Sequence, residues 1–166
     1  MKCRKINDEE IRTVKNLLSR YLGKNVEKLP FDNILVVGND LKRLQYVSGD
    51  ILQNILENEI SYKVSSMGIN LGVLLIKNDK EKFSPSLECL NLISNQIIKN
   101  YVILSDKGEE MFLYAKDAFE SSFEELNGDG KLVVFNKNKE LVGMGNYNGE
   151  LLINLMDKGW YLRNGG

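Results

Sequence analysis

The chain has 166 residues, of which 43% are hydrophobic and 27% are charged, as in a soluble globular protein of one or two domains. Its 22 basic and 23 acidic residues leave a formal charge of −1, which excludes both a wholesale polycation and an acidic disordered tail. Histidine is absent, so the chain cannot form a Ser-His-Asp triad, a Cys-His nucleophile pair or a His-ligated zinc site.

The cysteine pattern and the N-terminal segment limit which metal sites and which cellular compartment the sequence is compatible with. Cys3 and Cys89 are far apart and form no CxxC pair, so we expect no four-thiolate zinc site, no other metal and no cofactor. The N-terminal segment turns acidic at Asp8, where a signal peptide has its apolar core. No apolar run reaches the roughly 20 residues that cross a bilayer. We expect a cytoplasmic monomer with no membrane partner.

The first predicted element is a helix over residues 8–22. Ile11, Val14 and Leu18 recur at helical spacing. Asn7 and Glu10 have the spacing of a capping box. Gly23 tolerates the left-handed backbone that ends many helices, so the helix is expected to stop there.

Strands and a second helix are expected next. The pattern predicts a hairpin of residues 34–37 and 44–47, and then a helix that Ser48 caps and whose apolar face runs from Ile51 to Ile60. A strand over residues 71–76 should follow and return through residues 83–90. Pro85 should interrupt the returning strand, and Cys89 should be a small buried residue on it.

The second half predicts a small barrel or sandwich of short strands. Its expected elements are strands over residues 101–104, 132–135 and 141–144, a turn over residues 105–108, a short helix over residues 109–114, and an apolar segment over residues 151–155. Met111, Phe112 and Tyr114 should face inward, and at least one of Trp160 and Tyr161 should face the interior of a strand. Overall we expect an α+β protein with domains over residues 1–98 and 99–166.

Charge and glycine patterns give weak functional signals. Residues 1–100 hold 15 basic and 12 acidic residues, whereas residues 101–166 hold 7 basic and 11 acidic residues. Gly143, Gly145 and Gly149 do not have the spacing of a phosphate-binding loop, and we expect them to let a barrel strand bend. These residues alone indicate only a soluble two-part protein.

Several short motifs resemble one known family in order and spacing. The closing residues 157–163, the segments 99–104 and 108–114, and the hairpin of residues 132–145 with its Val-Gly-x-Gly pattern are similar to parts of a PUA domain. In the first half, residues 4–10, 21–23, 46–48 and 67–72 resemble the Nip-seven family. That family comprises large-ribosomal-subunit assembly factors of eukaryotes and archaea, and this chain resembles the archaeal type.

The resemblance implies a fold and a role. The fold would be an N-terminal α/β domain, with an antiparallel sheet and covering helices, followed by a C-terminal PUA-type β-barrel. The role would be non-catalytic binding of pre-ribosomal RNA, with other assembly factors as partners. The chain differs from the pattern in two places: Ala115 replaces a usual glycine, and residues 146–158 contain a single lysine, Lys158.

Candidate RNA-binding residues follow from this interpretation. Lys158 and Arg163 are the expected phosphate contacts of the PUA domain, Tyr147 is the expected stacking residue, and Arg4 and Lys5 are candidates on the first domain. Two alternatives stay open. The chain could be a protein-interaction module with little RNA affinity, or an RNA-targeting subunit of a tRNA or rRNA modification enzyme.

Overall fold

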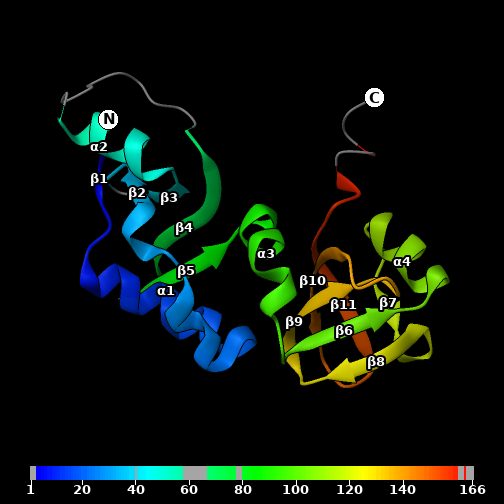
Figure 1. The fold of residues 1–166 in the computed structure, drawn as a ribbon. Coiled ribbons are helices and arrows are strands. Elements are labelled where there is room, and N and C mark those ends of the chain that lie inside the picture. Colours follow the sequence, from blue (N-terminus) through cyan, green and yellow to red (C-terminus); the bar gives the residue numbers. More distant parts are fainter. Residues whose placement is uncertain (1–2, 40, 58–66, 78–79, 161–162, 164–166) are drawn as a thin grey trace. The chain divides into compact units, whose positions relative to one another are not determined.

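The computed structural model describes residues 3–39, 41–57, 67–77, 80–160 and 163 (Figure 1). The chain divides into two compact units, one made of Met1–Ser19 with Lys24–Cys89 and the other of Arg20–Gly23 with Leu90–Gly166. Among the described helices none is long and apolar enough to cross a membrane. The residue at which one domain gives way to the next stays a prediction.

The first unit is built on a five-stranded antiparallel sheet in the order β1-β2-β3-β4-β5. Its strands are β1 Cys3–Lys5, β2 Ile34–Val37, β3 Lys42–Tyr46, β4 Ile69–Lys77 and β5 Lys80–Pro85. Its helical segments are α1 Asp8–Leu22, η1 Gly23–Lys28, η2 Phe31–Asn33 and α2 Gly49–Glu57, and α3 Leu87–Ile93 follows β5 (Figure 1). Strand β2 is buried along its whole length, so the core of this unit lies against it.

Helix α1 confirms the prediction from the capping box. The Glu10 backbone amide donates to Asn7 Oδ1 over 2.9 Å, and the Asn7 amide donates back to the Glu10 carboxylate over 3.2 Å. The helix ends before Gly23, whose φ is +56°. Local sequence therefore sets both ends of this helix.

The prediction of a strand over residues 83–90 is wrong in its second part. Strand β5 ends at Pro85, and Leu87 begins α3. The Ser86 hydroxyl accepts from the Cys89 amide over 3.0 Å, which is a side-chain cap at the start of a helix. Cys89 is buried as expected, but on this helix, and burial raises the pKa of its thiol to about 12.

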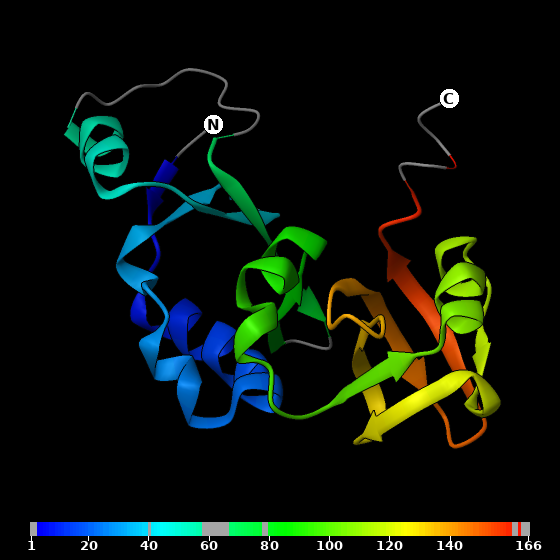
Figure 2. The ribbon, with the colours of Figure 1, turned by 45° about the vertical axis from the view of Figure 1, so that its right-hand side comes forward.

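The second unit holds a six-stranded sheet in the order β7-β11-β10-β9-β6-β8. Its strands are β6 Tyr101–Leu104, β7 Ala118–Phe119, β8 Phe123–Asn127, β9 Gly130–Phe135, β10 Leu141–Tyr147 and β11 Leu151–Asp157. Its helical segments are η3 Ser94–Gln96, α4 Asp106–Leu113 and η4 Glu120–Ser122. The sheet curls into a half-barrel, with β6 and β9 paired in parallel and its other described pairs antiparallel (Figure 2). The predicted α+β class is confirmed, and the sheet that was expected to form a small barrel is a half-barrel.

Glycine permits the close contact of β10 with β11. A Cβ atom at Gly143 would lie 2.2 Å from the carbonyl oxygen of Met156, a backbone atom that cannot move aside cheaply. At Gly145 a Cβ would lie 2.6 Å from Leu152 Cδ1. Gly143 and Gly145 therefore allow the close approach of β11, a role in packing rather than the strand bending that the sequence analysis expected.

Helix α4 starts earlier than predicted and ends in an unusual way. Ser105 caps it by accepting from the Gly108 amide, so the helix begins at Asp106 inside the predicted turn. At its end, the Ala115 amide donates to the Phe112 carbonyl and the Lys116 amide donates to the Met111 carbonyl. This pattern is a Schellman motif with Ala115 in the left-handed position at φ +58°.

One prediction about the orientation of an aromatic side chain in this unit is wrong, and a second is not tested. Phe112 is fully buried, but Tyr114 is 64% exposed because the helix has already ended there. Trp160 follows the turn after β11, which ends at Asp157, and is helical and largely exposed. Because Tyr161 lies outside the described residues, the expectation that at least one of these two rings faces the interior of a strand stays a prediction.

A buried carboxylate joins three strands of the first unit to α1. Glu10 is 1% exposed, and its carboxylate accepts from both terminal nitrogens of Arg4 over 2.6 and 2.8 Å and from Lys42 Nζ at 2.8 Å. Lys42 also pairs with Glu81 on β5 at 2.6 Å. The Arg4 hydrogen bonds hold the pKa of Glu10 at about 2, below its ordinary value of 4.5.

We predict that Glu10→Gln lowers the free energy of unfolding by about 3 kcal/mol at pH 7. Because the folded-state pKa of Glu10 is depressed, its contribution is complete above about pH 4.5 and is lost as the pH falls toward 2. Urea unfolding at pH 7 and pH 3 should show the difference between the two proteins narrowing by about half. Glu9→Gln, on the exposed side of the same helical turn, should change stability little at either pH. An equal loss of stability in both variants would contradict the claim that the buried Glu10 carboxylate makes the stabilising ion pairs.

We also predict that Ala115→Gly stabilises the protein by about 1 kcal/mol, because glycine adopts the left-handed backbone without the steric cost that a Cβ adds. Thermal or urea unfolding measures the gain. The same substitution at Ala118, which is fully buried in the core, should instead destabilise the protein. A loss of stability in the Ala115→Gly variant would contradict the claim that the left-handed backbone of Ala115 is strained.

Candidate nucleic-acid interface

Two adjoining hollows mark one surface of the second unit. The larger, the Lys158 hollow, has a volume of about 640 Å³ and is lined by Asn91, Ser94, Asn95, Glu109, Leu113, Asn136, Lys139, Glu140, Leu141, Val142 and Lys158. The smaller, the Tyr101 hollow, has a volume of about 260 Å³ and is lined by Ser94, Asn95, Ile97, Tyr101, Ile103, Phe135 and Lys139. Since Ser94, Asn95 and Lys139 line both, the two hollows form one groove.

The buried side chain of Asn136 shapes the hairpin turn on one wall of the groove. Its Oδ1 accepts from the backbone amides of Asn138 and Glu140, and its Nδ2 donates to the carboxylates of Glu109 and Glu140. The side chain therefore uses both its acceptor and its donors while it is only 7% exposed. The turn that it fixes holds Lys139 with a φ of +60° at the boundary of the two hollows.

Among the described residues, two cations line the groove, Lys139 and Lys158. Lys158 Nζ donates to Asn91 Oδ1 over 3.1 Å, and its backbone amide donates to the Val142 carbonyl. Neither Lys158 nor Lys139 has an ion-pair partner among the described residues, and both are exposed. Glu109 and Glu140 line the same hollow, so the charge of the lining is balanced. The groove can accept a polyanion through a few positioned cations, and it lacks a broad basic field.

Arg163, the second predicted phosphate contact, is held by the protein itself. Its guanidinium forms two hydrogen bonds with the Asp157 carboxylate, over 2.9 and 3.1 Å, and donates to the Leu113 carbonyl. Asp157 is 4% exposed, so this ion pair neutralises a buried charge at the end of β11. The role of Arg163 in phosphate binding stays a prediction, and its structural role is evident.

Tyr147, the predicted stacking residue, lies in the core of the half-barrel. It is 9% exposed, and its ring packs edge-on against Phe123 with the ring centres 5.6 Å apart. Burial raises the pKa of its hydroxyl. Little ring surface is therefore open to a base, and the stacking role that the sequence analysis gave to Tyr147 stays a prediction without support from its burial.

Arg4 and Lys5 belong to the first unit, and the structure gives them different surroundings. Arg4 forms the bidentate ion pair with buried Glu10. Lys5 is half exposed, lies 3.8 Å from Asp32, and lines a separate hollow of about 410 Å³ beside α2. These two residues therefore lie outside the groove of the second unit.

Sequence reasoning missed several residues of the groove, namely Asn91, Ser94, Asn95, Tyr101, Asn136 and Lys139. One signal was present: the turn Asn136-Lys137-Asn138-Lys139 carries two lysines between strands. Lys137 pairs with Asp106 at 2.9 Å, so Lys139 is the lysine of this turn that lines the groove. The described residues contain no cluster of three or more metal-ligating side chains.

We predict that Arg163→Gln destabilises the protein, because it leaves the buried Asp157 carboxylate without its cation. Chemical denaturation would measure the loss. Adding Asp157→Asn should recover part of the lost stability, so that the effects of the two substitutions are not additive in a double-mutant cycle. Additive effects of the two substitutions would show that the ion pair is unimportant.

Comparison with known proteins places the chain in a family. Residues 3–87 match the model of the NIP7/UPF0113 pre-PUA domain, and residues 100–166 match the model of the UPF0113 PUA domain. A UPF0113 protein of the archaeon Aeropyrum pernix is 29% identical over 141 residues, which cover 80% of this chain and 75% of that protein.

Solved structures share the fold. A conserved PUA domain protein from Thermoplasma acidophilum superposes with a TM-score of 0.59 at 14% identity, covering 95% of each chain. A hypothetical protein from Pyrococcus horikoshii superposes with a TM-score of 0.57 at 10% identity, covering 97% of this chain and 99% of that one. With both halves of the sequence matched and the architecture shared, the chain belongs to the NIP7/UPF0113 family and consists of a pre-PUA domain followed by a PUA domain.

Proposed function

We propose that this protein binds single-stranded RNA in the groove of its second unit and acts, without catalysing a reaction, in the assembly of the large ribosomal subunit. The observation that carries RNA binding is the pair of lysines, Lys139 and Lys158, which face one continuous groove of a PUA-family domain without ion-pair partners among the described residues. The ribosomal role rests on family membership, and pre-rRNA and other assembly factors are the proposed partners.

The chemistry of the groove suits a backbone phosphate. Lysine ammonium groups contact phosphate oxygens as compact point charges, and the Asn91 carbonyl holds Lys158 at the wall of the hollow. Side-chain amides of Asn91 and Asn95 can donate to phosphate or sugar oxygens. Because two cations line the groove among the residues that the structure describes, affinity should depend weakly on salt, with a slope of about 1.4 for two single-strand phosphate contacts.

The groove offers little for catalysis. The ionisable groups of the Lys158 hollow are Lys139, Lys158, Glu109 and Glu140, and the two carboxylates accept hydrogen bonds from Asn136. These carboxylates are structural partners of the turn, so a binding role accounts for the arrangement better than acid–base chemistry.

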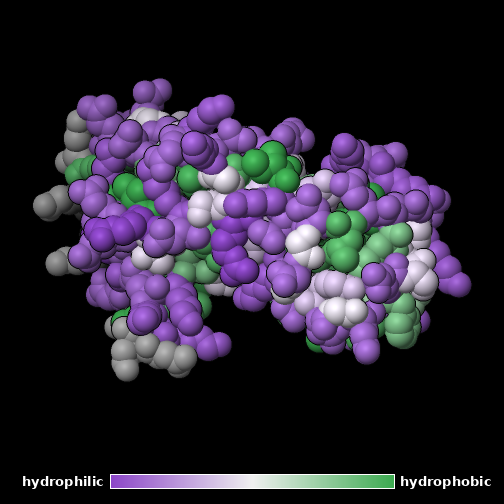
Figure 3. All heavy atoms as spheres, turned by 90° about the horizontal axis from the view of Figure 1, so that it is seen from below, coloured by the Kyte–Doolittle hydropathy of each residue, from purple (hydrophilic) through white to green (hydrophobic). Residues whose placement is uncertain are grey.

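A protein-interaction role is a second candidate, favoured by apolar side chains at the surface of the same unit. Phe119, Ile153 and Leu155 on β7 and β11 are between 38% and 62% exposed. The face in Figure 3 is mostly hydrophilic, with apolar groups gathered at a few places. This candidate predicts that the purified protein has no affinity for free RNA but associates with precursors of the large subunit.

Lys158→Gln should weaken binding of an octauridylate RNA and lower the slope of log K against log salt by about 0.7, the loss of one single-strand phosphate contact. Fluorescence anisotropy between 50 and 300 mM salt, roughly the range over which such contacts are resolved, gives both quantities. The matched control is Lys131→Gln, since Lys131 is exposed on β9 outside both hollows.

Equal affinities of Lys158→Gln and the unmodified protein at every salt concentration would remove Lys158 from the binding site. Absence of any octauridylate binding by the unmodified protein would favour the protein-interaction role instead. A loss of equal size in Lys131→Gln would show a general charge effect rather than a located contact.

A further inference from the structure

The Tyr101 hollow is built on the outer face of β6. Alternate residues of this strand point to opposite sides, so Val102 and Leu104 enter the barrel core while Tyr101 and Ile103 line the hollow. In the parallel pair with β9, Ile103 lies opposite Phe135, which also lines the hollow. The core of the barrel therefore supports this wall directly.

An aromatic pair forms the wall. The rings of Tyr101 and Phe135 meet edge to face, with centres 6.2 Å apart and planes at 76°. The Tyr101 hydroxyl donates to the Glu125 carboxylate on β8, which anchors the ring at its outer end. Tyr101 is only partly buried, so its ring keeps open surface toward the hollow. A fixed ring with open surface is a stacking platform for a planar ligand.

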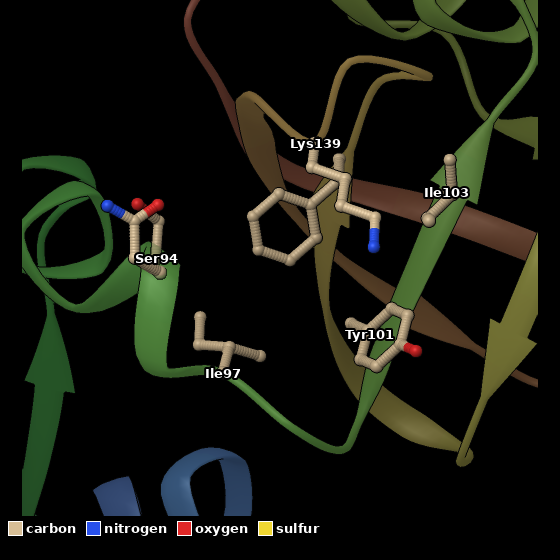
Figure 4. Close-up of a pocket in the computed structure, with 7 residues that line it drawn as sticks. Ser94, Ile97, Tyr101, Ile103 and Lys139 are labelled. Atoms are coloured by element: carbon tan, nitrogen blue, oxygen red, sulfur yellow. The ribbon is translucent and has the colours of Figure 1, made fainter.

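Polar groups and one cation complete the lining. Figure 4 shows Lys139 extending its ammonium group into the same space that Tyr101 and Ile103 border, with Ser94 and Ile97 across it. The Ser94 hydroxyl donates to the Asn91 carbonyl over 2.8 Å, which leaves its lone pairs free to accept. The exposed Asn95 side chain adds both donors and an acceptor.

The size of the hollow limits what it can hold. Its volume of about 260 Å³ lies just below the roughly 300–1,000 Å³ of pockets that take drug-sized ligands. One heterocyclic ring is therefore a better fit than two stacked ones. Lys139 also lines the neighbouring Lys158 hollow, so one cation borders both the ring-sized space and the proposed path of the RNA backbone.

From this geometry we infer that the Tyr101 hollow receives one unstacked nucleobase of the bound RNA, stacked on Tyr101, while Lys139 contacts the phosphate of the same nucleotide. Ser94 and Asn95 face the edge of the base and supply its hydrogen-bond partners. This inference rests on the proposed RNA-binding function and adds to it the class of ligand that the smaller hollow takes. RNA recognition by splayed bases on aromatic side chains uses the same chemistry.

The test compares octauridylate with a ribose-phosphate octamer of the same length that lacks bases. Tyr101→Ala should bind octauridylate about tenfold more weakly than the unmodified protein, since stacking on one aromatic side chain contributes about 1–3 kcal/mol. On the baseless octamer the two proteins should bind equally. Tyr101→Phe keeps the ring and should bind octauridylate within about twofold of the unmodified protein.

Two further measurements distinguish a lost base contact from a folding defect in Tyr101→Ala. Ser94→Phe fills the hollow from η3 without touching the barrel core, and it should reproduce the loss on octauridylate. In an NMR titration with uridine 5′-monophosphate, the methyl signals of Ile97 and Ile103 should shift, whereas that of Ile153 on β11 should not.

The outcomes separate the two proposals. Octauridylate binding that is unchanged by Tyr101→Ala and by Ser94→Phe overturns the base site and leaves RNA binding by the protein intact. A loss of equal size on the baseless octamer also overturns it, because the effect would then not depend on a base. If the unmodified protein binds neither RNA nor the mononucleotide, both the base site and the proposed function fail.

Discussion

The buried amide of Asn136 is the interaction on which the groove depends. It joins the backbone of the β9–β10 turn to two carboxylates, one on the same turn and one on α4. A buried side chain with all these bonds made allows one arrangement of the turn, because any other leaves polar groups unpaired. That arrangement places Lys139 in a left-handed backbone conformation where the two hollows meet.

Three of the described cations neutralise buried carboxylates of the protein itself. Arg4 and Lys42 neutralise Glu10 in the first unit, and Arg163 neutralises Asp157 in the second. Buried carboxylates would be costly without these cations, so the same arginines are poor candidates for contacts that must form and break with a ligand. Lys139 and Lys158 in the groove form no ion pair with a buried carboxylate among the described residues. A nucleic acid held there would gain more from base stacking and hydrogen bonding than from neutralisation of many phosphates.

The sequence predicted those parts of the fold that local residues determine. Helix α1, with its capping box and its glycine stop, has its determinants within a few residues, and the prediction of its ends is confirmed. The anomaly at Ala115 was visible as a missing glycine, and the structure explains it by the left-handed backbone there. The pre-PUA and PUA organisation also followed, because it depends on the order of motifs along the whole chain.

The functional surface was harder to predict because it depends on register and on distant partners. Tyr101 lies outside and Tyr147 inside the barrel only because of how β6 and β10 pair with their neighbours. Arg163 could be recognised as structural only once β11 was seen to bury Asp157. Asn136 lies in a turn without a periodic sequence pattern, and its hydrogen-bond partner Glu109 is 27 residues away in the chain. No pattern in the sequence therefore indicated that its side chain is buried.

Crosslinking in cells, followed by sequencing of the attached RNA, tests the central claim most directly. The account predicts that large-subunit rRNA precursors are recovered with the unmodified protein and are depleted with a Lys139→Gln/Lys158→Gln variant of equal stability. Recovery of mainly tRNA, or equal recovery of rRNA with the variant, would contradict it.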